Sequence, residues 1–165
     1  MITYVKSTLE DVDTEATSDA EIGFEVTNFI NILTAEGSLE NRNSGHRMTL
    51  KRPHPKVSID PNDADMLIVK SPGAKLRFEI SPSGIFPIGI AFQLREGVAN
   101  PSDLERLGFL NFTQMRLHPD GNRLSVTDAF TDDEADDRYK FSMIVQRASD
   151  GEIAIVDPGI RHQPI

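Results

Sequence analysis

Charged and apolar residues alternate strictly along the stretch Lys75-Leu76-Arg77-Phe78-Glu79-Ile80. Successive side chains of a β-strand point to opposite faces of the sheet, so the three apolar residues would face a core and the three charged ones solvent. The segment from Tyr139 to Val145 repeats this pattern, with Tyr, Phe, Met and Val on the inward face. Two half-buried strands of this kind predict a mainly β protein.

Further strand candidates and turns surround these two segments. Short apolar stretches predict strands at residues 48–50, 57–59, 66–69, 88–94 and 110–117. Two pairs of strand candidates are separated by Asp120-Gly121-Asn122 and by Asp150-Gly151. These residue types tolerate a positive φ, which tight hairpin turns need. Many short strands separated by Gly and Pro favour an antiparallel β-sandwich.

Tyr139 favours an immunoglobulin-like version of the sandwich. It lies at the start of a long predicted strand, two residues before the inward-facing Phe141. Immunoglobulin-like domains place a Tyr there, with its ring inside the sandwich and its hydroxyl bonded to a preceding loop. A tyrosine at an ordinary strand end is the alternative interpretation.

The N-terminal residues 1–45 are interpreted as an acidic extension, and residues 46–165 as the sandwich domain. Within the extension, Ser18 to Glu21 has the spacing of a helix capping box. A helix over residues 19–35 is favoured because apolar residues recur at helical spacing, namely Ile22, Val26, Phe29, Ile30 and Leu33. The alternation from Ile22 to Val26 supports a strand as the alternative.

Charge is distributed unevenly along the chain, whose formal net charge is −9. Residues 7–40 contain nine acids and no base, whereas residues 41–56 contain five bases and no acid. The bases are candidate interaction residues, facing an acidic run of this chain or of a second copy, with a solvated surface as the alternative. They are Arg42, Arg47, Lys51, Arg52 and Lys56.

The same charge balance bears on the kind of partner. An acidic chain is a poor match for the phosphate backbone of nucleic acids and for anionic membrane surfaces. The basic stretch also lacks the interleaved aromatic residues that stack on bases. We therefore expect neither nucleic acid nor a membrane as partner.

A second acidic run supplies candidate metal ligands, with calcium as the cation that such oxygens would hold. Its members are Asp128, Asp132, Asp133, Glu134, Asp136 and Asp137. A shorter set, from Asp60 to Asp65, is another candidate, and its alternative is a polar turn. The four His residues lack the spacing of zinc-protease motifs, so only a site of dispersed His and carboxylate residues would involve them. No other cofactor is expected.

Motifs for catalysis and for targeting are missing from the sequence. It contains no nucleophile elbow and no glycine-rich phosphate loop, and it has no Cys. An enzyme is therefore less expected than a binding protein. The first 30 residues lack a basic segment followed by an apolar one, which predicts a cytoplasmic protein.

Residues 56–162 resemble the DP-EP family of small bacterial proteins. The resemblance rests on the runs 124–129, 139–146 and 151–153, and on the ending Val156-Asp157-Pro158-Gly159-Ile160. It implies a β-sandwich of immunoglobulin type and no established activity. Independently of the family, Pro158 cannot donate to a sheet ladder and so ends a strand, and Asp157 could accept hydrogen bonds at that exit. Both residues are interpreted as structural.

The leading hypothesis is a non-enzymatic sandwich that binds another protein or associates with itself. One alternative is a metal-dependent sandwich that uses His and carboxylate residues. Another is a small-molecule-binding module whose apolar pocket lies between the sheets.

Overall fold

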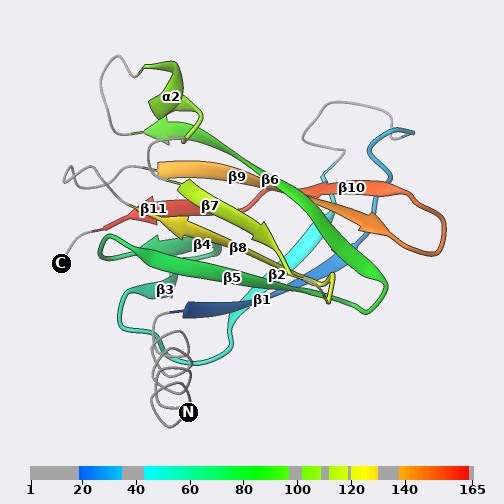
Figure 1. Ribbon diagram of the computed structural model, residues 1–165, viewed down its shortest axis with the longest axis horizontal. Coiled ribbons are helices and arrows are strands. Elements are labelled where there is room, and N and C mark those ends of the chain that lie inside the picture. Colours follow the sequence, from blue (N-terminus) through cyan, green and yellow to red (C-terminus); the bar gives the residue numbers. More distant parts are fainter. Residues whose placement is uncertain are drawn as a thin grey trace, which may run out of the picture.

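The computed structural model describes residues 19–34, 43–96, 102–108, 112–118, 120–129 and 138–163, which form a β-sandwich of two mixed sheets (Figure 1). The strands of the five-stranded sheet are β1 (Asp19–Asn28), β2 (Gly45–Leu50), β5 (Ala74–Ser81), β7 (Phe112–Leu117) and β8 (Arg123–Asp128). They lie in the order β2-β1-β5-β8-β7. Strands β2 and β7 therefore form the edges of this sheet.

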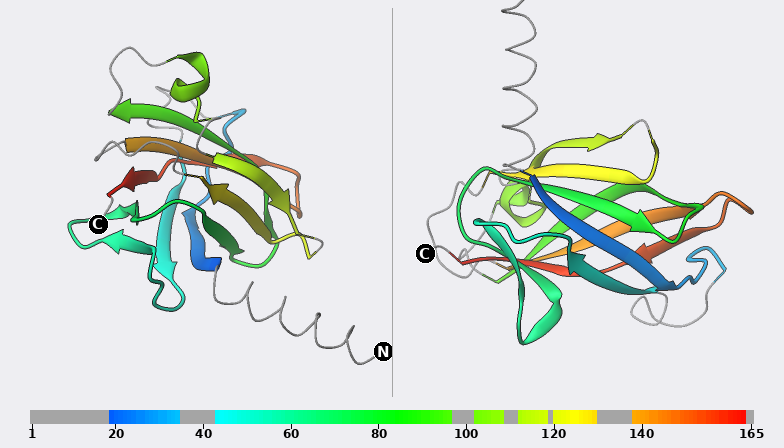
Figure 2. Two further views of the ribbon diagram at one scale, coloured as in Figure 1. Left: turned by 60° about the vertical axis from the view of Figure 1, so that its left-hand side comes forward. Right: turned by 90° about the horizontal axis from the view of Figure 1, so that it is seen from below.

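The six-stranded sheet is built around one long central strand. Its members are β3 (Val57–Asp60), β4 (Asp63–Val69), β6 (Ile85–Glu96), β9 (Arg138–Arg147), β10 (Ile153–Val156) and β11 (Gly159–His162). Strand β9 pairs with β6 on one side and with β10 and β11 on the other, and β4 and β3 continue beyond β11. The short helix α2 (Asp103–Arg106) packs beside one end of β6 (Figures 1 and 2).

The two alternating segments form the centre of the core, as predicted. Leu76, Phe78 and Ile80 of β5 are at most 3% exposed, and the inward residues of β9 are equally buried. The rings of Phe78 and Phe141 lie 5.4 Å apart between the sheets. Burying one side chain of this size contributes roughly 1.5–3 kcal/mol, so these strands provide much of the drive for packing the two layers together.

The hairpin predictions are confirmed. Strands β7 and β8 are joined through Gly121, whose φ is 82°, and β9 and β10 through Gly151, whose φ is 73°. Only residues that tolerate a left-handed backbone suit such positions, which is why these two glycines identify the turns in the sequence.

The helix over residues 19–35 is wrong, and the strand alternative is correct for Asp19–Asn28. Strand β1 buries Ala20, Ile22 and Phe24 completely, with the period of two that a strand requires. It lies between β2 and β5 and pairs with the backbone of both strands. This pairing stabilises the strand more than the weak helical spacing of its apolar residues would stabilise a helix. A Cβ on Gly23 would lie 2.7 Å from Thr49 Oγ1, so a close approach between strands needs this glycine. Residues 19–28, assigned to the acidic extension, thus form part of the sandwich.

The sheets are mixed rather than antiparallel throughout. Strand β1 runs parallel to β5, and β11 runs parallel to β4. Tyr139 is buried at the start of β9, with its ring edge-on to Phe112 at 4.9 Å between centroids. Its ring packs inside as expected, while the immunoglobulin-like arrangement stays a prediction. In the part of the chain that the structure describes, none of the helical structure is long and apolar enough to cross a membrane.

Candidate functional site

Asp128, the first of the candidate metal ligands, lies in the interior of the sandwich. Its Oδ2 is 2.7 Å from Nε2 of His162, and neither side chain is exposed. The pair joins β8 of one sheet to β11 of the other. The other five candidates, Asp132, Asp133, Glu134, Asp136 and Asp137, lie outside the described residues. Within the described ranges, no group of three or more potential ligands could hold a metal ion.

The shorter acidic set forms the polar turn between β3 and β4. Asp60 accepts a hydrogen bond from the backbone N–H of Asn62 at 2.8 Å, and Asp63 accepts one from that of Asp65 at 3.0 Å. Such side-chain contacts to the backbone two residues onward stabilise tight turns. These carboxylates therefore act in the turn itself.

Three of the basic candidate residues form ion pairs on the outer face of the five-stranded sheet. Arg47 lies 3.4 Å from Glu25, Lys51 lies 2.6 Å from Glu79, and Arg52 lies 3.5 Å from Glu21. Glu21 and Glu25 belong to the acidic run 7–40, so the basic stretch contacts an acidic run of its own chain.

The structure describes only one of the other two basic candidates. Lys56 donates to the backbone oxygen of Pro72 at 3.5 Å, and Arg42 lies outside the described residues. Exposed ion pairs contribute at most about 1 kcal/mol each, so the three ion pairs neutralise charge more than they stabilise the fold.

Asp157 is the centre of a polar cluster on the other sheet. It follows β10, and its carboxylate accepts hydrogen bonds from Asn43 Nδ2 at 2.6 Å and from Ser142 Oγ at 2.5 Å. The ammonium of Lys140 lies 3.1 Å from the same carboxylate. The Asp157 side chain is only 14% exposed, so the three donors compensate for the water it has lost.

Pro158 has the structural role expected of it. It separates β10 from β11, and its carbonyl accepts a hydrogen bond from the N–H of Phe141 at 2.9 Å. The Asp-Pro pair thus redirects the chain between two strands that both lie beside β9. Asp157, in contrast, accepts from side chains rather than from the backbone N–H groups that we expected.

The alternation of β6 and β9 places more polar side chains around this cluster. Because Phe141 and Phe92 face the core, Lys140, Ser142, Ala91 and Gln93 must project from the outer face. The register pairs Gln93 with Lys140 and Ala91 with Ser142. The two strands therefore bring one continuous row of outward side chains together.

A hollow of about 560 Å³ lies over these outward side chains. A second hollow of about 340 Å³ shares Arg95, Lys140 and Asp157 with it, so the two adjoin, and together we call them the outer groove. The remaining residues of the larger hollow are Ile32, Asn43, Ala91, Phe92, Gln93, Arg106, Leu107, Ser142 and Ile155. The hollow lies outside the sandwich, and not between the sheets as the small-molecule hypothesis supposed.

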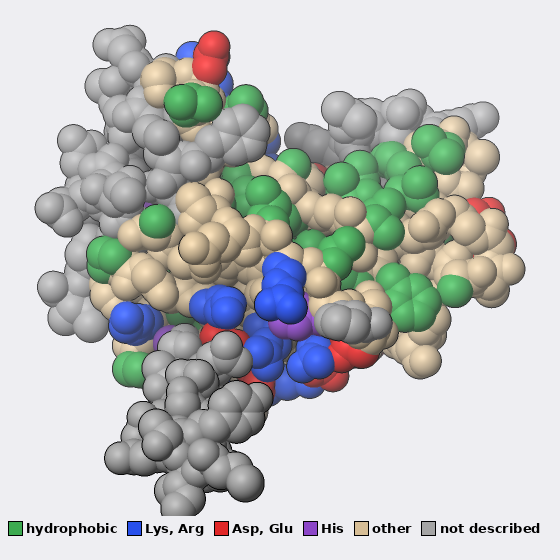
Figure 3. Space-filling model, in the orientation of Figure 1, with side chains coloured by type: hydrophobic (Ala, Val, Ile, Leu, Met, Phe, Trp, Pro, Cys, Tyr) green, Lys and Arg blue, Asp and Glu red, His purple; other side chains and the backbone are tan. Residues whose placement is uncertain are grey.

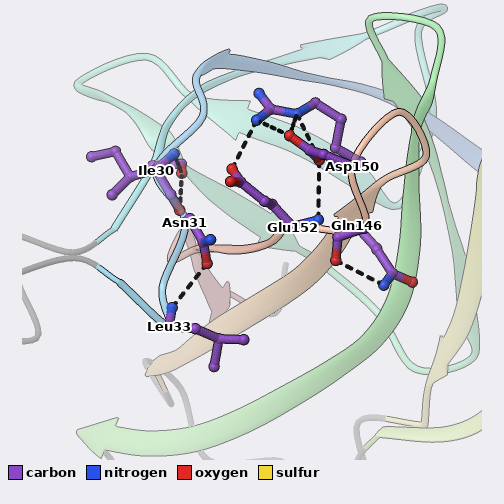
Figure 4. A network of polar contacts seen from close by, with 9 residues as sticks. Ile30, Asn31, Leu33, Gln146, Asp150 and Glu152 are labelled. Atoms are coloured by element: carbon purple, nitrogen blue, oxygen red, sulfur yellow. Dashed lines mark hydrogen bonds and ion pairs between the residues drawn. The ribbon is translucent and has the colours of Figure 1, made fainter.

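The β9–β10 hairpin holds the segment that carries Ile32 to the groove. The backbone N–H of Ile32 donates to the carbonyl of Ile153 in β10 at 2.8 Å. The guanidinium of Arg147 stacks 4.2 Å from the ring centre of Phe29 and binds both Asp150 and Glu152. Figure 4 shows Asp150 and Glu152 together at this hairpin, with Asn31 and Leu33 on the neighbouring segment. The segment that carries Ile32 forms one wall of the outer groove, and backbone and charged contacts thus hold it in place.

Gly108 fixes the opposite wall, which α2 and Leu107 form. Its φ is 74°, and a Cβ on it would lie 2.9 Å from both Phe92 and Phe112. Those two rings stack at 3.8 Å between centroids. Only a glycine allows the chain to turn here directly against the stacked rings, and this turn positions Arg106 and Leu107 over the groove.

The charges of the outer groove are unequal along its length. Arg95, Arg106 and Lys140 line the larger hollow with one acid, Asp157. Lys140 is paired with that acid, and Arg106 lies 3.8 Å from Asp103 of its own helix, whereas Arg95 forms no ion pair with any residue that the structure describes. Asp63 and Asp65 line the far end of the smaller hollow. The groove therefore offers a cationic end beside α2 and an acidic end beside β4.

Comparison with protein-family models, with curated proteins and with solved structures finds no match to this chain. The resemblance to the DP-EP family accordingly stays a prediction. Sequence reasoning singled out Asp157 through its neighbouring proline but missed Ser142, Lys140, Arg95 and Arg106. The alternation that carries Lys140 and Ser142 was visible as a signal, but their meeting with Arg95 depends on the register of β6 and β9.

Proposed function

We propose that this protein is a binding module whose outer groove receives an acidic segment of a protein partner. The observation that supports this most directly is the cationic end of the groove, where the exposed Arg95 forms no ion pair with any described residue and Arg106 of α2 lines the same hollow. Guanidinium groups bind carboxylates through two parallel hydrogen bonds, which favours aspartate or glutamate side chains in the partner.

The shape of the groove favours a protein segment over a small molecule. Pockets for small ligands enclose most of the ligand surface, whereas this groove is open and extends over two adjoining hollows on the outside of a sheet. Ile32, Leu107 and Ile155 supply apolar surface between the charges. An extended segment with alternating acidic and apolar residues would match both features.

Fluorescence anisotropy with a labelled ten-residue peptide of alternating glutamate and leucine would test this proposal. A peptide with lysine in place of glutamate is the matched probe. We expect the acidic peptide to bind and the double variant Arg95→Gln, Arg106→Gln to bind it about tenfold more weakly, since two partly exposed pairs contribute roughly 1.4 kcal/mol together. Arg47→Gln removes one exposed arginine from the other sheet and should leave the affinity unchanged.

Equal binding of the two peptides would overturn the proposal, as would an equal loss in the Arg47 variant. Light scattering of the free chain across a range of salt concentrations would identify the partner further. Salt-sensitive dimers that dissociate in the Arg95, Arg106 double variant would identify the partner as a second copy of this chain.

A further inference from the structure

The N-terminal part of the chain contains a segment with the pattern that the outer groove favours. Residues 1–18 lie outside the described residues and continue directly into β1. Within them, acids occupy every second position at Asp11, Asp13 and Glu15. The residues that alternate with these acids are uncharged, namely Val12, Thr14 and Ala16. Residues two apart in an extended segment point to the same side, so the three carboxylates would face one row of cations together.

The second acidic run of the chain has a different pattern. Its members Asp132, Asp133 and Glu134 are consecutive, and so are Asp136 and Asp137. Consecutive side chains of an extended segment point to opposite sides, so this run cannot present all its carboxylates to one row of cations. The alternating run is therefore the better match for a groove.

Charge varies along the N-terminal segment as it does along the outer groove. Lys6 is the only base among residues 1–40, and the alternating acids follow it. The groove is cationic beside α2 and acidic beside β4, where Asp63 and Asp65 line it. A segment that lies along the groove with Lys6 toward β4 would place its acids near Arg95 and Arg106. Both ends of the segment would then meet the opposite charge.

The basic residues of the five-stranded sheet are less suited to an acidic segment. Figure 3 shows Lys and Arg side chains beside Asp and Glu on that face. Arg77, for example, lies 2.6 Å from Asp19 and 3.6 Å from Glu21. In the groove, Arg95 forms no ion pair with any described residue. An approaching carboxylate would therefore compete with acids of the chain itself on the five-stranded sheet, but not at Arg95.

The segment is too closely tethered to reach the groove of its own chain. Asp19 is fixed in the five-stranded sheet, where it is only 2% exposed and accepts a hydrogen bond from Arg77. The three peptide units that join Ala16 to Asp19 span at most about 11 Å. Stacked sheets lie about 10 Å apart, and the chain would also have to pass round the edge of the six-stranded sheet to reach its outer face. The groove of a second copy is not subject to this limit.

We propose that residues 9–16 of one chain bind in the outer groove of a second copy, with their alternating acids facing Arg95 and Arg106. This inference rests on the function proposed for the groove and identifies the partner as this chain itself. Two chains that exchange their segments reciprocally form a closed dimer with two equal contacts.

Sedimentation of the full-length chain over a range of concentrations would measure this association. The triple variant Asp11→Asn, Asp13→Asn, Glu15→Gln removes the alternating charges, and we expect it to raise the dissociation constant of the dimer about tenfold. The variant Asp132→Asn, Asp133→Asn, Glu134→Gln changes the net charge equally and is the matched control, which should not weaken the dimer.

The two triple variants separate specific binding from a general charge effect. Both reduce the repulsion between two acidic chains, so a general effect would strengthen association in both. The double variant Arg95→Gln, Arg106→Gln should weaken the dimer, whereas Arg47→Gln should not. Equal weakening by the two triple variants, or no weakening by the first, would overturn the inference.

The anisotropy assay with the peptide of glutamate and leucine separates this inference from the proposed function. If the segment occupies the groove of a second copy, the Asp11, Asp13, Glu15 variant should bind the peptide more tightly than the unaltered chain does where the latter dimerises. Peptide binding by an unaltered chain that is monomeric at every concentration would refute the inference and leave the proposed function intact. A triple variant that does not bind the peptide at all would refute both.

Discussion

The buried contact between Asp128 and His162 offers the sharpest test of how the two sheets are held together. The two side chains are completely buried and 2.7 Å apart, and each comes from a different sheet. The His162 ring lies 6.0 Å from the ring of Phe112 and 5.5 Å from that of Tyr139, so its surroundings are largely aromatic. We expect the substitution Asp128→Leu to be strongly destabilising, because it leaves the imidazole among these rings without its carboxylate.

The expected magnitude follows from the burial of both groups. Removing one partner of a buried pair costs about 3–5 kcal/mol, which is a large part of the roughly 5–15 kcal/mol that stabilises a typical domain. The reciprocal substitution His162→Phe should cost a similar amount, because it leaves a buried carboxylate. The double variant should be more stable than either single one, since apolar residues of similar volume often replace a buried pair at little cost.

Urea denaturation followed by circular dichroism would measure all three free energies of unfolding. With a slope of about 1–3 kcal/mol per molar urea, each single variant should lower the midpoint by about 1–5 M at unchanged slope. A double variant as unstable as the sum of its parts would refute the reasoning, because independent sites add and coupled ones do not. A loss below about 1 kcal/mol for Asp128→Leu would refute it too.

Three further outcomes follow from the structure. Gly108→Ala should destabilise the chain by about 1 kcal/mol or more beyond Gly73→Ala in urea denaturation: both glycines have positive φ, but a Cβ at Gly108 would also meet two phenylalanine rings, whereas Gly73 faces open space. Replacing His118 with Gln should make the free energy of unfolding fall less steeply as the pH drops below about 6.5. The lowered pKa of His118 makes the folded chain bind fewer protons there than the unfolded chain does, and an unchanged dependence of stability on pH would contradict this. Arg147→Ala should speed hydrogen exchange at the backbone N–H of Ile32, since it removes the guanidinium that clamps the groove wall; unchanged protection would show that the backbone contact suffices.

Strands with one buried face were predictable from the sequence because their period has a single physical explanation. Leu76, Phe78 and Ile80 all face the core, and residues spaced two apart would not share one face of a helix. The segment from Ile22 onward was ambiguous because Ile22 and Val26 fit the spacing of both a helix and a strand. Only its neighbours β2 and β5, which lie far along the chain, decide the outcome.

The outer groove was not predictable to the same degree. Asp157 was identifiable because it precedes a proline, but its donors Asn43 and Ser142 come from segments distant in the sequence. Their meeting depends on strand register and on the path of the segment that follows β1. Local patterns contain no information about either, so residues such as Arg95 could not be told from ordinary exposed positions.

The net charge of the chain is a poor guide to what its surfaces attract. Basic residues that are conspicuous in the sequence, such as Arg47 and Lys51, are paired with acids of other strands in the same sheet, which neutralises their charge locally. Arg95 and Arg116 stand in less conspicuous contexts but form no ion pair with the described residues. Since exposed charges are screened beyond about 8–10 Å, an approaching ligand responds to this local imbalance and not to the total of −9. Ion pairs between strands can therefore leave a locally positive surface on a protein whose net charge is negative.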